Sequence, residues 1–314
     1  MVLSCILLIL GIILLVKGAD LFVEGSGTIA RALKIPPLVI GLTLVSIGTS
    51  APEASVSLIS SIKGLNDLSF CNVVGSNIFN TLLILGISSL IIPAAIGKDV
   101  KKYDIPAMLT LYLLLVLFAF VITPLRIDIF EGVILLILFV SYTVWLVLRA
   151  KKSIIKQKDV KKVTKGALIK SVLFAVFGLA GIIFGGKLVV DNASKIAKAC
   201  GMSEALVGLT IVAAGTSLPE LVTSVVAAVK KENDIAIGNV IGSNIFNIAF
   251  ITGLSAAINP LVLNRSALTD LLVMLASGAL VAVVALFSKK CKRAHGALFV
   301  LLYIGYLTYI IIRN

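Results

Sequence analysis

Long apolar runs that do not alternate with polar residues dominate this chain. Residues 6–16 and 134–147 are examples. Runs of about 20 apolar residues are long enough to cross the hydrocarbon core of a bilayer as helices. Only helices or a closed barrel satisfy the backbone inside lipid, and barrel strands alternate over about ten residues. The pattern therefore predicts an all-α integral membrane protein.

Ten such spans can be drawn, five on each side of a polar stretch. The composition agrees, with 59% hydrophobic and 14% charged residues, against about 25% charged residues in soluble proteins. The spans cover residues 2–24, 37–62, 68–93, 105–123 and 128–149, then 167–195, 204–229, 235–258, 267–288 and 296–312.

Two polar motifs occur twice at a constant offset. GLTLVSIGTSAPE (41–53) and NVVGSNIFN (72–80) return as GLTIVAAGTSLPE (208–220) and NVIGSNIFN (239–247), and the offset is 220 − 53 = 167. The chain is therefore two fused copies of one unit.

The repeat divides the chain into a first five-helix repeat (1–149), a basic linker (150–166) and a second five-helix repeat (167–314). Because five is odd, the second copy must enter the membrane from the opposite side. Inverted repeats of this kind are typical of secondary transporters, in which broken helices form the binding site near the bilayer midplane.

Lysines and arginines lie mainly between the predicted spans. The net charge is +13, and seven lysines fall within residues 151–165. Cytoplasmic loops are enriched in Lys and Arg, so we expect a multi-pass protein of the plasma membrane with a cytoplasmic linker and both termini outside. Charge placed in loops indicates orientation and no nucleic-acid partner. The four cysteines show no paired spacing and are expected to be small apolar fillers.

The first motif of each copy is expected to break its helix. Gly48 lowers helix propensity and Pro52 removes a backbone donor, and Gly215 and Pro219 repeat the pattern. Broken backbone at membrane depth is tolerated only where it is buried in protein or lines a cavity. Freed carbonyls beside hydroxyls and a carboxylate form an all-oxygen environment, which suits Na⁺ or Ca²⁺.

One glutamate per copy, Glu53 or Glu220, falls inside the apolar sequence. A carboxylate at a helix centre costs about 2.5–3.5 kcal/mol on the insertion scale, so two at equivalent points favour an ion-binding role. Ser50 and Ser217 stand three residues earlier, which is also capping-box spacing, with Pro at a permitted early position. Capping and ion binding are compatible here.

The second motif places a serine and an asparagine four residues apart, on one helix face. An amide oxygen adds a ligand without adding charge, which favours these asparagines as ligands. The residues are Ser76 and Asn80 in the first copy, and Ser243 and Asn247 in the second. For the intervening Asn77 and Asn244, a role in helix packing is equally open.

Other polar residues are weaker candidates. Asp67 and Asp234 are expected to cap helices, and Asp20 is expected to be paired or to snorkel. The mirrored pair Glu24 and Asp191 lies near span ends. The only histidine lies in a basic loop, so no histidine relay, zinc site or Ser-His-Asp triad can be built, and no enzyme activity is expected.

At the two repeated motifs the sequence resembles the cation/calcium exchanger superfamily, and specifically the prokaryotic sodium/calcium exchangers. The resemblance covers about 40 residues in each half. It implies transported Ca²⁺ and Na⁺ rather than a resident cofactor, and four cation positions at the midplane. It implies central ligand roles for Glu53 and Glu220, flanked by Asn80 and Asn247. Oxygens of Thr49, Ser50, Thr216, Ser217, Ser76 and Ser243 and the backbones of Ser46 and Ala213 would complete the set.

The sequence departs from several relatives at Asn247, where they have Asp, including the potassium-dependent branch. This leaves two carboxylates and argues against K⁺ co-transport. One Ca²⁺ would neutralise the site, whereas the three Na⁺ that the family suggests would leave it at +1. Exchange would then be electrogenic, worth about 2.3 kcal/mol per net charge per 100 mV.

The function expected is therefore Na⁺/Ca²⁺ antiport by alternating access in a functional monomer, with the first and sixth spans sliding against the rest. Two alternatives stay open. In a proton-coupled Ca²⁺ antiporter the buried carboxylates would carry H⁺ instead of Na⁺. A cation channel would place its acidic groups around the pore axis of an oligomer.

Overall fold

The computed structural model describes all residues except 157–163, 203–206, 208–210, 212, 289 and 314. Over the described residues, eight helices are long and apolar enough to cross a membrane. A ninth candidate is the pair of helices Pro37–Thr49 and Ala51–Ile62, which is bent by 50°. The seventh predicted span, 204–229, contributes the helix Leu218–Val229, and its beginning lies partly outside the described residues. The helical membrane architecture is confirmed, and the number ten stays a prediction.

The first half consists of helices interrupted by π-helical segments (η) and two short strands. In order these are α1 (Val2–Leu33), α2 (Pro37–Ile40), η1 (Gly41–Val45), α3 (Ser46–Thr49), α4 (Ala51–Ile62), α5 (Asn66–Ile78), η2 (Phe79–Ile84), α6 (Leu85–Ile91), β1 (Ala94–Ala95), η3 (Val100–Asp104), α7 (Ile105–Leu117), η4 (Phe118–Ile122), β2 (Arg126–Ile127) and α8 (Ile129–Lys156).

The second half repeats this order over the described residues, except that a continuous helix, α15, replaces η3, α7 and η4. Its elements are α9 (Lys165–Ala199), α11 (Ala213–Gly215), α12 (Leu218–Val229), α13 (Asn233–Phe246), η6 (Asn247–Thr252), α14 (Gly253–Ile258), β3 (Leu261–Val262), α15 (Arg265–Phe287), β4 (Lys290–Cys291) and α16 (Arg293–Arg313).

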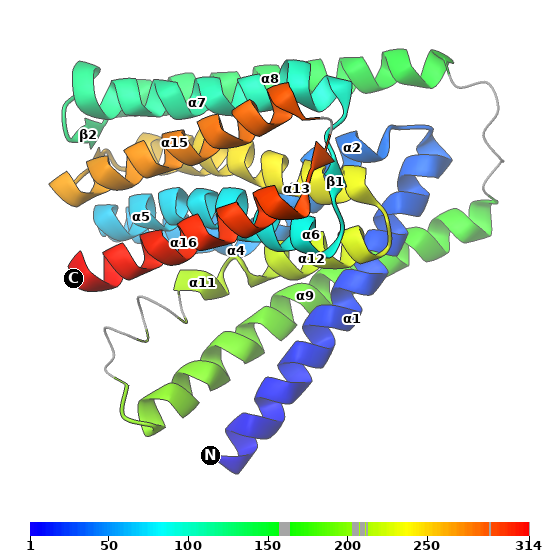
Figure 1. The fold of residues 1–314 in the computed structure, drawn as a ribbon, viewed down its shortest axis with the longest axis horizontal. Helices are drawn as coiled ribbons and strands as arrows, with labels where there is room; N and C mark the ends of the chain where they lie inside the picture. Colours follow the sequence, from blue (N-terminus) through cyan, green and yellow to red (C-terminus); the bar gives the residue numbers. More distant parts are fainter. Residues whose placement is uncertain (157–163, 203–206, 208–210, 212, 289, 314) are drawn as a thin grey trace.

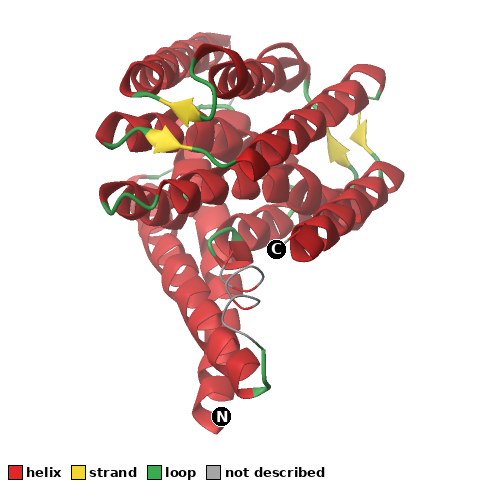
Figure 2. Ribbon diagram, turned by 90° about the vertical axis from the view of Figure 1, so that its left-hand side faces the viewer, coloured by secondary structure: helices red, strands yellow, loops and turns green. Residues whose placement is uncertain are grey.

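Helices α1 and α9 lie side by side and run obliquely to the remaining helices (Figures 1 and 2). Glycines allow their backbones to touch. A Cβ atom added to Gly18 would lie 2.7 Å from the carbonyl oxygen of Gly178, and one added to Gly178 would lie 2.5 Å from the nitrogen of Phe22. Such close approach of backbones is a common way of packing helices in membranes. The two helices therefore form a unit of their own, which we call the α1–α9 pair.

The other helices form a bundle around α5 and α13. In the span that begins with α13, 94% of the most apolar 18-residue stretch is buried. In the span that begins with α5, the corresponding share is 72%. Strands β1 and β4 pair antiparallel, with Ala94 opposite Cys291, and β2 and β3 pair with Ile127 opposite Leu261. Each half thus contributes one strand to each pair, and β1 and β2 lie at opposite ends of the bundle (Figure 1).

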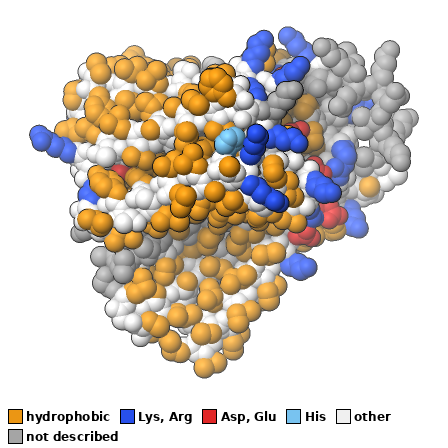
Figure 3. All heavy atoms as spheres, in the orientation of Figure 1, with side chains coloured by type: hydrophobic (Ala, Val, Ile, Leu, Met, Phe, Trp, Pro, Cys, Tyr) orange, Lys and Arg blue, Asp and Glu red, His pale blue; other side chains and the backbone are white. Residues whose placement is uncertain are grey.

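Hydrophobic side chains cover most of the surface, and Lys and Arg gather mainly toward one end of the bundle (Figure 3). This end includes the region of β1 and the end of α1 (Figure 1). The distribution suits a protein whose sides face lipid and whose charged ends face water.

Three expectations about local structure are corrected. Helix α8 continues to Lys156, into the predicted linker, of which 157–163 lie outside the described residues. Asp67 and Asp234 are not N-caps, because each lies in the first turn of its helix. A negatively charged side chain there interacts favourably with the helix dipole. Of the four cysteines, Cys291 is buried, whereas Cys5, Cys71 and Cys200 are exposed, so the filler role applies only to Cys291.

Candidate cation-binding site

Both predicted helix breaks are present, and each lies immediately before a glutamate-bearing helix. Ser50 separates α3 from α4, and Thr216 and Ser217 separate α11 from α12. The proline of each motif occupies the first turn of the following helix, where its missing N–H costs nothing. Glu53 and Glu220 also lie in this turn, and their exposed fractions are 0% and 1%.

The two breaks exchange hydrogen bonds across the repeats. The hydroxyl Oγ of Ser50 donates to Oε1 of Glu220 at 2.7 Å, and Oγ of Ser217 donates to Oε1 of Glu53 at 2.9 Å. Ser217 Oγ also lies 3.3 Å from Oγ of Ser76. Neither Ser50 nor Ser217 makes a side-chain cap, although each occupies the N-cap position. The capping role expected from the spacing is therefore wrong, because each hydroxyl binds the carboxylate of the other repeat.

Several buried oxygen atoms of this cluster have no hydrogen-bond partner among the described residues. They are Oε2 of Glu53, Oε2 of Glu220, Oδ1 of Asn80, Oδ1 of Asn247 and Oγ of Ser243. A buried carboxylate without a compensating charge is costly. A set of carboxylate, amide and hydroxyl oxygens is the donor set of hard cations. The residues present therefore fit Na⁺ or Ca²⁺.

The two candidate asparagines begin π-helical segments or lie within them. Asn80 is the second residue of η2 and Asn247 the first of η6. Segment η2 packs against α12, and η6 packs against α4, so each faces the glutamate-bearing helix of the other repeat. Single π-helical turns are frequent at functional sites, whereas the sequence pattern predicts regular helices there.

The intervening asparagines bind neighbouring helices. Nδ2 of Asn244 donates to Oγ1 of Thr81 at 2.9 Å and lies 3.6 Å from the sulfur of Met108. Nδ2 of Asn77 lies 3.8 Å from the sulfur of Met274, and its Oδ1 accepts from Nδ2 of Asn247 at 3.3 Å. These contacts favour helix packing, with Asn77 also supporting Asn247.

The structure describes the remaining residues of the two motifs to different extents. Thr49 and Ser46 are buried, and the carbonyl of Ser46 accepts from Oγ1 of Thr49 at 3.3 Å. Ala213 begins α11. The residues Gly208, Leu209 and Thr210 of the second motif lie outside the described part of the chain.

Two further asparagines join the network, Asn72 and Asn239. Each is the first residue of the second motif in its repeat, and the sequence predicted no role for either. The signal was present, because each stands four residues before the serine of its motif and so shares its helix face. Asn239 and Thr49 are buried, whereas Asn72 and Thr216 are half-buried.

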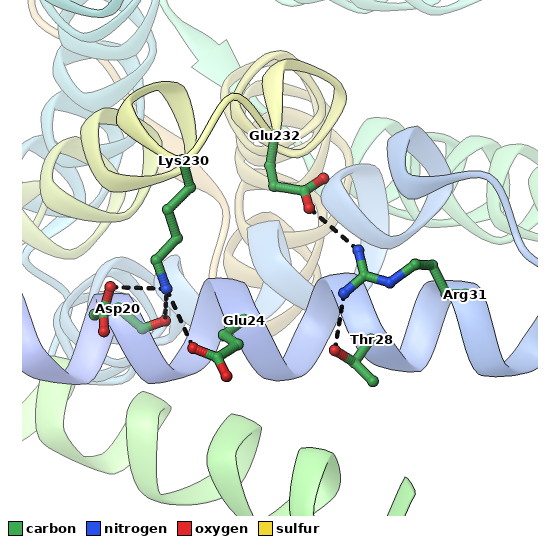
Figure 4. Close-up of polar contacts among 6 residues, drawn as sticks. All are labelled: Asp20, Glu24, Thr28, Arg31, Lys230 and Glu232. Carbon is green, nitrogen blue, oxygen red and sulfur yellow. Dashed lines mark hydrogen bonds and ion pairs between the residues drawn. The ribbon is translucent and has the colours of Figure 1, made fainter. Parts of the chain in front are cut away.

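Asp20 and Glu24 lie outside this buried cluster. Nζ of Lys230 lies 2.7 Å from Oδ1 of Asp20 and 3.5 Å from Oε2 of Glu24, and Arg31 binds Glu232 at 3.2 Å (Figure 4). These pairs connect α1 to the turn between α12 and α13. The paired role expected for Asp20 is confirmed.

The chain matches a family model described as sodium/calcium exchanger protein over residues 3–148 and 170–312. The putative antiporter CaxA of Alkalimonas amylolytica is 36% identical over 315 residues, which is 98% of each chain. The sodium/calcium exchanger MaX1 of Methanosarcina acetivorans is 32% identical over 340 residues, covering 96% of this chain and 97% of that protein.

Solved structures of the sodium-calcium exchanger NCX_Mj share the fold. The structure soaked with zero Na⁺ and Ca²⁺ is 35% identical, has a TM-score of 0.85, and is matched over 98% of this chain and 99% of that one. The structure soaked with 2.5 mM Na⁺ and 0.1 mM Ca²⁺ has a TM-score of 0.86.

Proposed function

Because this chain belongs to the sodium/calcium exchanger protein family, and is therefore a membrane transporter for cation/Ca²⁺ antiport rather than an enzyme, we propose that it exchanges Na⁺ for Ca²⁺ by alternating access. The exchange is electrogenic and independent of K⁺. The ligands are the twelve residues that the resemblance implies, with Glu53 and Glu220 at the centre.

One observation carries the proposal. Two buried carboxylates each bind a serine of the other repeat through one oxygen and leave the second oxygen unpaired among the described residues. Two negative charges can be balanced by one Ca²⁺, and several Na⁺ can compete for the same oxygens. A site left with both charges uncompensated is costly in a low-dielectric interior. This disfavours a change of access without a bound cation and so favours obligatory exchange.

Inverted repeats, 1–149 and 167–314, provide the two access states. Reciprocal hydrogen bonds and the position of β1 and β2 at opposite ends of the bundle support this relation. Asn72 and Thr216 are half-buried, whereas Asn239 and Thr49 are buried. This difference supports access of cations to the site from the end of the bundle at which α5 begins. The α1–α9 pair slides against the bundle to change the access. Since one chain supplies both halves of the site, a monomer suffices.

The test is Ca²⁺ uptake by the purified protein in proteoliposomes, driven by an outward Na⁺ gradient at fixed pH and without K⁺. We expect saturable uptake that an interior-negative membrane potential slows, because three Na⁺ leaving for one Ca²⁺ entering would move one net positive charge outward. Uptake driven by a pH gradient without Na⁺ would instead indicate proton coupling, and flux without a counter-ion would indicate a channel.

Matched variants connect this transport to the site. Glu53→Gln and Glu220→Gln should each reduce exchange to background, because each removes a charge that balances Ca²⁺. Glu131→Gln is the control, since Glu131 is also a buried carboxylate but binds Thr123 and the backbone of Asp128, remote from the two glutamates in sequence and in its contacts. Full transport by either site variant would overturn the ligand assignment.

A further inference from the structure

Asn72 and Asn239 make the same three contacts in the two repeats. Nδ2 of Asn239 donates to Oγ of Ser224 at 2.9 Å and to the carbonyl oxygen of Glu220 at 3.4 Å, and its Oδ1 accepts from Oγ1 of Thr49 at 3.1 Å.

In the first repeat, Nδ2 of Asn72 donates to Oγ of Ser57 at 2.9 Å and to the carbonyl oxygen of Glu53 at 3.3 Å. Its Oδ1 lies 3.5 Å from Oγ1 of Thr216. Two occurrences of one arrangement in independent halves of the chain argue against chance contacts.

Each amide joins the two repeats at the cation site. Its nitrogen holds the backbone of the glutamate in its own repeat, and its oxygen holds the threonine at the helix break of the other repeat. Only a side chain with two donors and one acceptor on a short stem can make these contacts, and among the small polar side chains only the amide of Asn offers them.

The contact to threonine also determines where a hydroxyl proton points. Oγ1 of Thr49 lies 3.1 Å from Oδ1 of Asn239 and 3.3 Å from the carbonyl oxygen of Ser46, and it also interacts with the carboxylate of Glu220. A proton donated to Asn239 leaves the lone pairs of the hydroxyl and of the Ser46 carbonyl available to a cation. Without the amide, the proton would turn to the Ser46 carbonyl or to the Glu220 carboxylate, and the oxygen that accepts it would be less available to a cation.

We propose that Asn239 and Asn72 are positioning residues of the cation site, which fix the glutamate backbone of one repeat and the threonine hydroxyl of the other for cation binding. The identity of the cation rests on the proposed function. Residues that orient metal ligands in this way typically change affinity by 10–100-fold when they are lost.

The experiment measures Ca²⁺ binding to the purified full-length protein by isothermal titration calorimetry, with thermal unfolding of the ion-free protein measured in parallel. Asn239→Ala should weaken Ca²⁺ binding about 10–100-fold. The control is Asn259→Ala, because Asn259 also joins the two halves, through Nδ2 to the carbonyl of Ser61 at 3.1 Å, but contacts none of the candidate ligands in doing so. It should leave the dissociation constant unchanged.

A double-mutant cycle separates positioning from a general loss of stability. If Asn239 acts through Thr49, the effect of Thr49→Val on the Ca²⁺ dissociation constant should be much smaller in the Asn239→Ala background than in the wild type. Thr216→Val, on the opposite contact, should add its full effect. Asn72→Ala provides the same cycle with Thr216 if Asn239→Ala does not fold.

Unchanged Ca²⁺ affinity in Asn239→Ala, with or without a lower melting temperature, would overturn the proposal, as would strict additivity with Thr49→Val. A wild-type protein that binds neither Ca²⁺ nor Na⁺ would overturn the proposed function itself. The two failures are therefore distinguishable, because only the first leaves wild-type binding intact.

Discussion

The serines at the two helix breaks bind partners far away in the sequence. Ser50 binds Glu220 at a separation of 170 residues, and Ser217 binds Glu53 at a separation of 164. A capping serine would instead bind a backbone N–H two or three residues later. The hydroxyl that could have stabilised its own helix is used to hold the carboxylate of the other repeat, which indicates that local helix stability is subordinate to the site.

Asn247 provides a test of charge at the residue scale. Its Nδ2 donates to Oδ1 of Asn77 at 3.3 Å. Asn247→Asp would add a third carboxylate and place two acceptors opposite each other. Since ligand charge tunes cation affinity, we expect the half-saturating Na⁺ concentration for exchange to change by about tenfold, together with the preference among Na⁺, Li⁺ and K⁺, measured by Ca²⁺ uptake.

The matched variant is Asn244→Asp, because the amide of Asn244 donates to Thr81 and not to a candidate ligand. It should leave the ion profile unchanged. An unaltered profile in Asn247→Asp would remove this residue from the site.

The sequence predicted which side chains come together but not how they pair. Glu53, Glu220 and their serines could be identified because ionisable and hydroxyl groups repeat inside apolar sequence. The serine–glutamate exchange could not, because motif spacing reports only contacts within one helix. Asn72 and Asn239 share a helix face with the serine of their motif, but their contacts were missed because all three groups that each one contacts lie 15 or more residues away in the sequence.

At the scale of elements, the α1–α9 pair is held together by backbone contact and is joined to the bundle at one end by ion pairs. At the offset of 167, Asp20 corresponds to Lys187 and Glu232 to Leu65, so the pairs Lys230–Asp20 and Arg31–Glu232 have no counterpart of matching charge, whereas Lys230 and Glu24 correspond to Lys63 and Asp191. The first span was expected to end at residue 24, whereas α1 continues to Leu33, and Arg31 in this extension binds Glu232 in the α12–α13 turn.

Sliding of the α1–α9 pair can be tested by restraining it. In a variant without the native cysteines, a cleavable thiol cross-linker between cysteines at positions 20 and 230 should stop exchange, because Asp20 and Lys230 belong to the pair and to the bundle respectively. Cleaving the linker should restore Ca²⁺ uptake.

A cross-link within the pair is the control for this restraint. Positions 14 and 181 are suitable, since a Cβ added to Gly181 would lie 3.3 Å from the carbonyl oxygen of Leu14. It should be tolerated, because the two helices move together. Exchange that continued with positions 20 and 230 linked would contradict the sliding mechanism.

For the whole molecule, each half completes its structure with parts of the other. Strand β1 pairs with β4 and β2 with β3, and the serines and glutamates exchange in the same reciprocal way. The repeated motifs predicted two related halves, and the odd number of spans predicted their inversion. The π-helical segments were not predicted, and the interleaving of the halves could not be, because it depends on contacts between the copies.

Inversion of the repeats predicts the sidedness of the molecule. Cys200, which is exposed beyond the end of α9, should react with a membrane-impermeant maleimide in right-side-out vesicles when it is the only cysteine. A cysteine at position 152, in the exposed end of α8, should react only in inverted vesicles. The opposite labelling pattern would reverse the orientation, and labelling of both from one side would contradict the inverted arrangement.

The exchange of serine and glutamate between the halves also bears on biosynthesis. When the first half leaves the ribosome and enters the bilayer, Glu53 has no hydroxyl partner, because Ser217 has not yet been made. The nascent first half must therefore remain incompletely assembled until most of the chain has been translated. Factors that shelter polar helices during insertion are accordingly expected to contact the first half before the second one arrives.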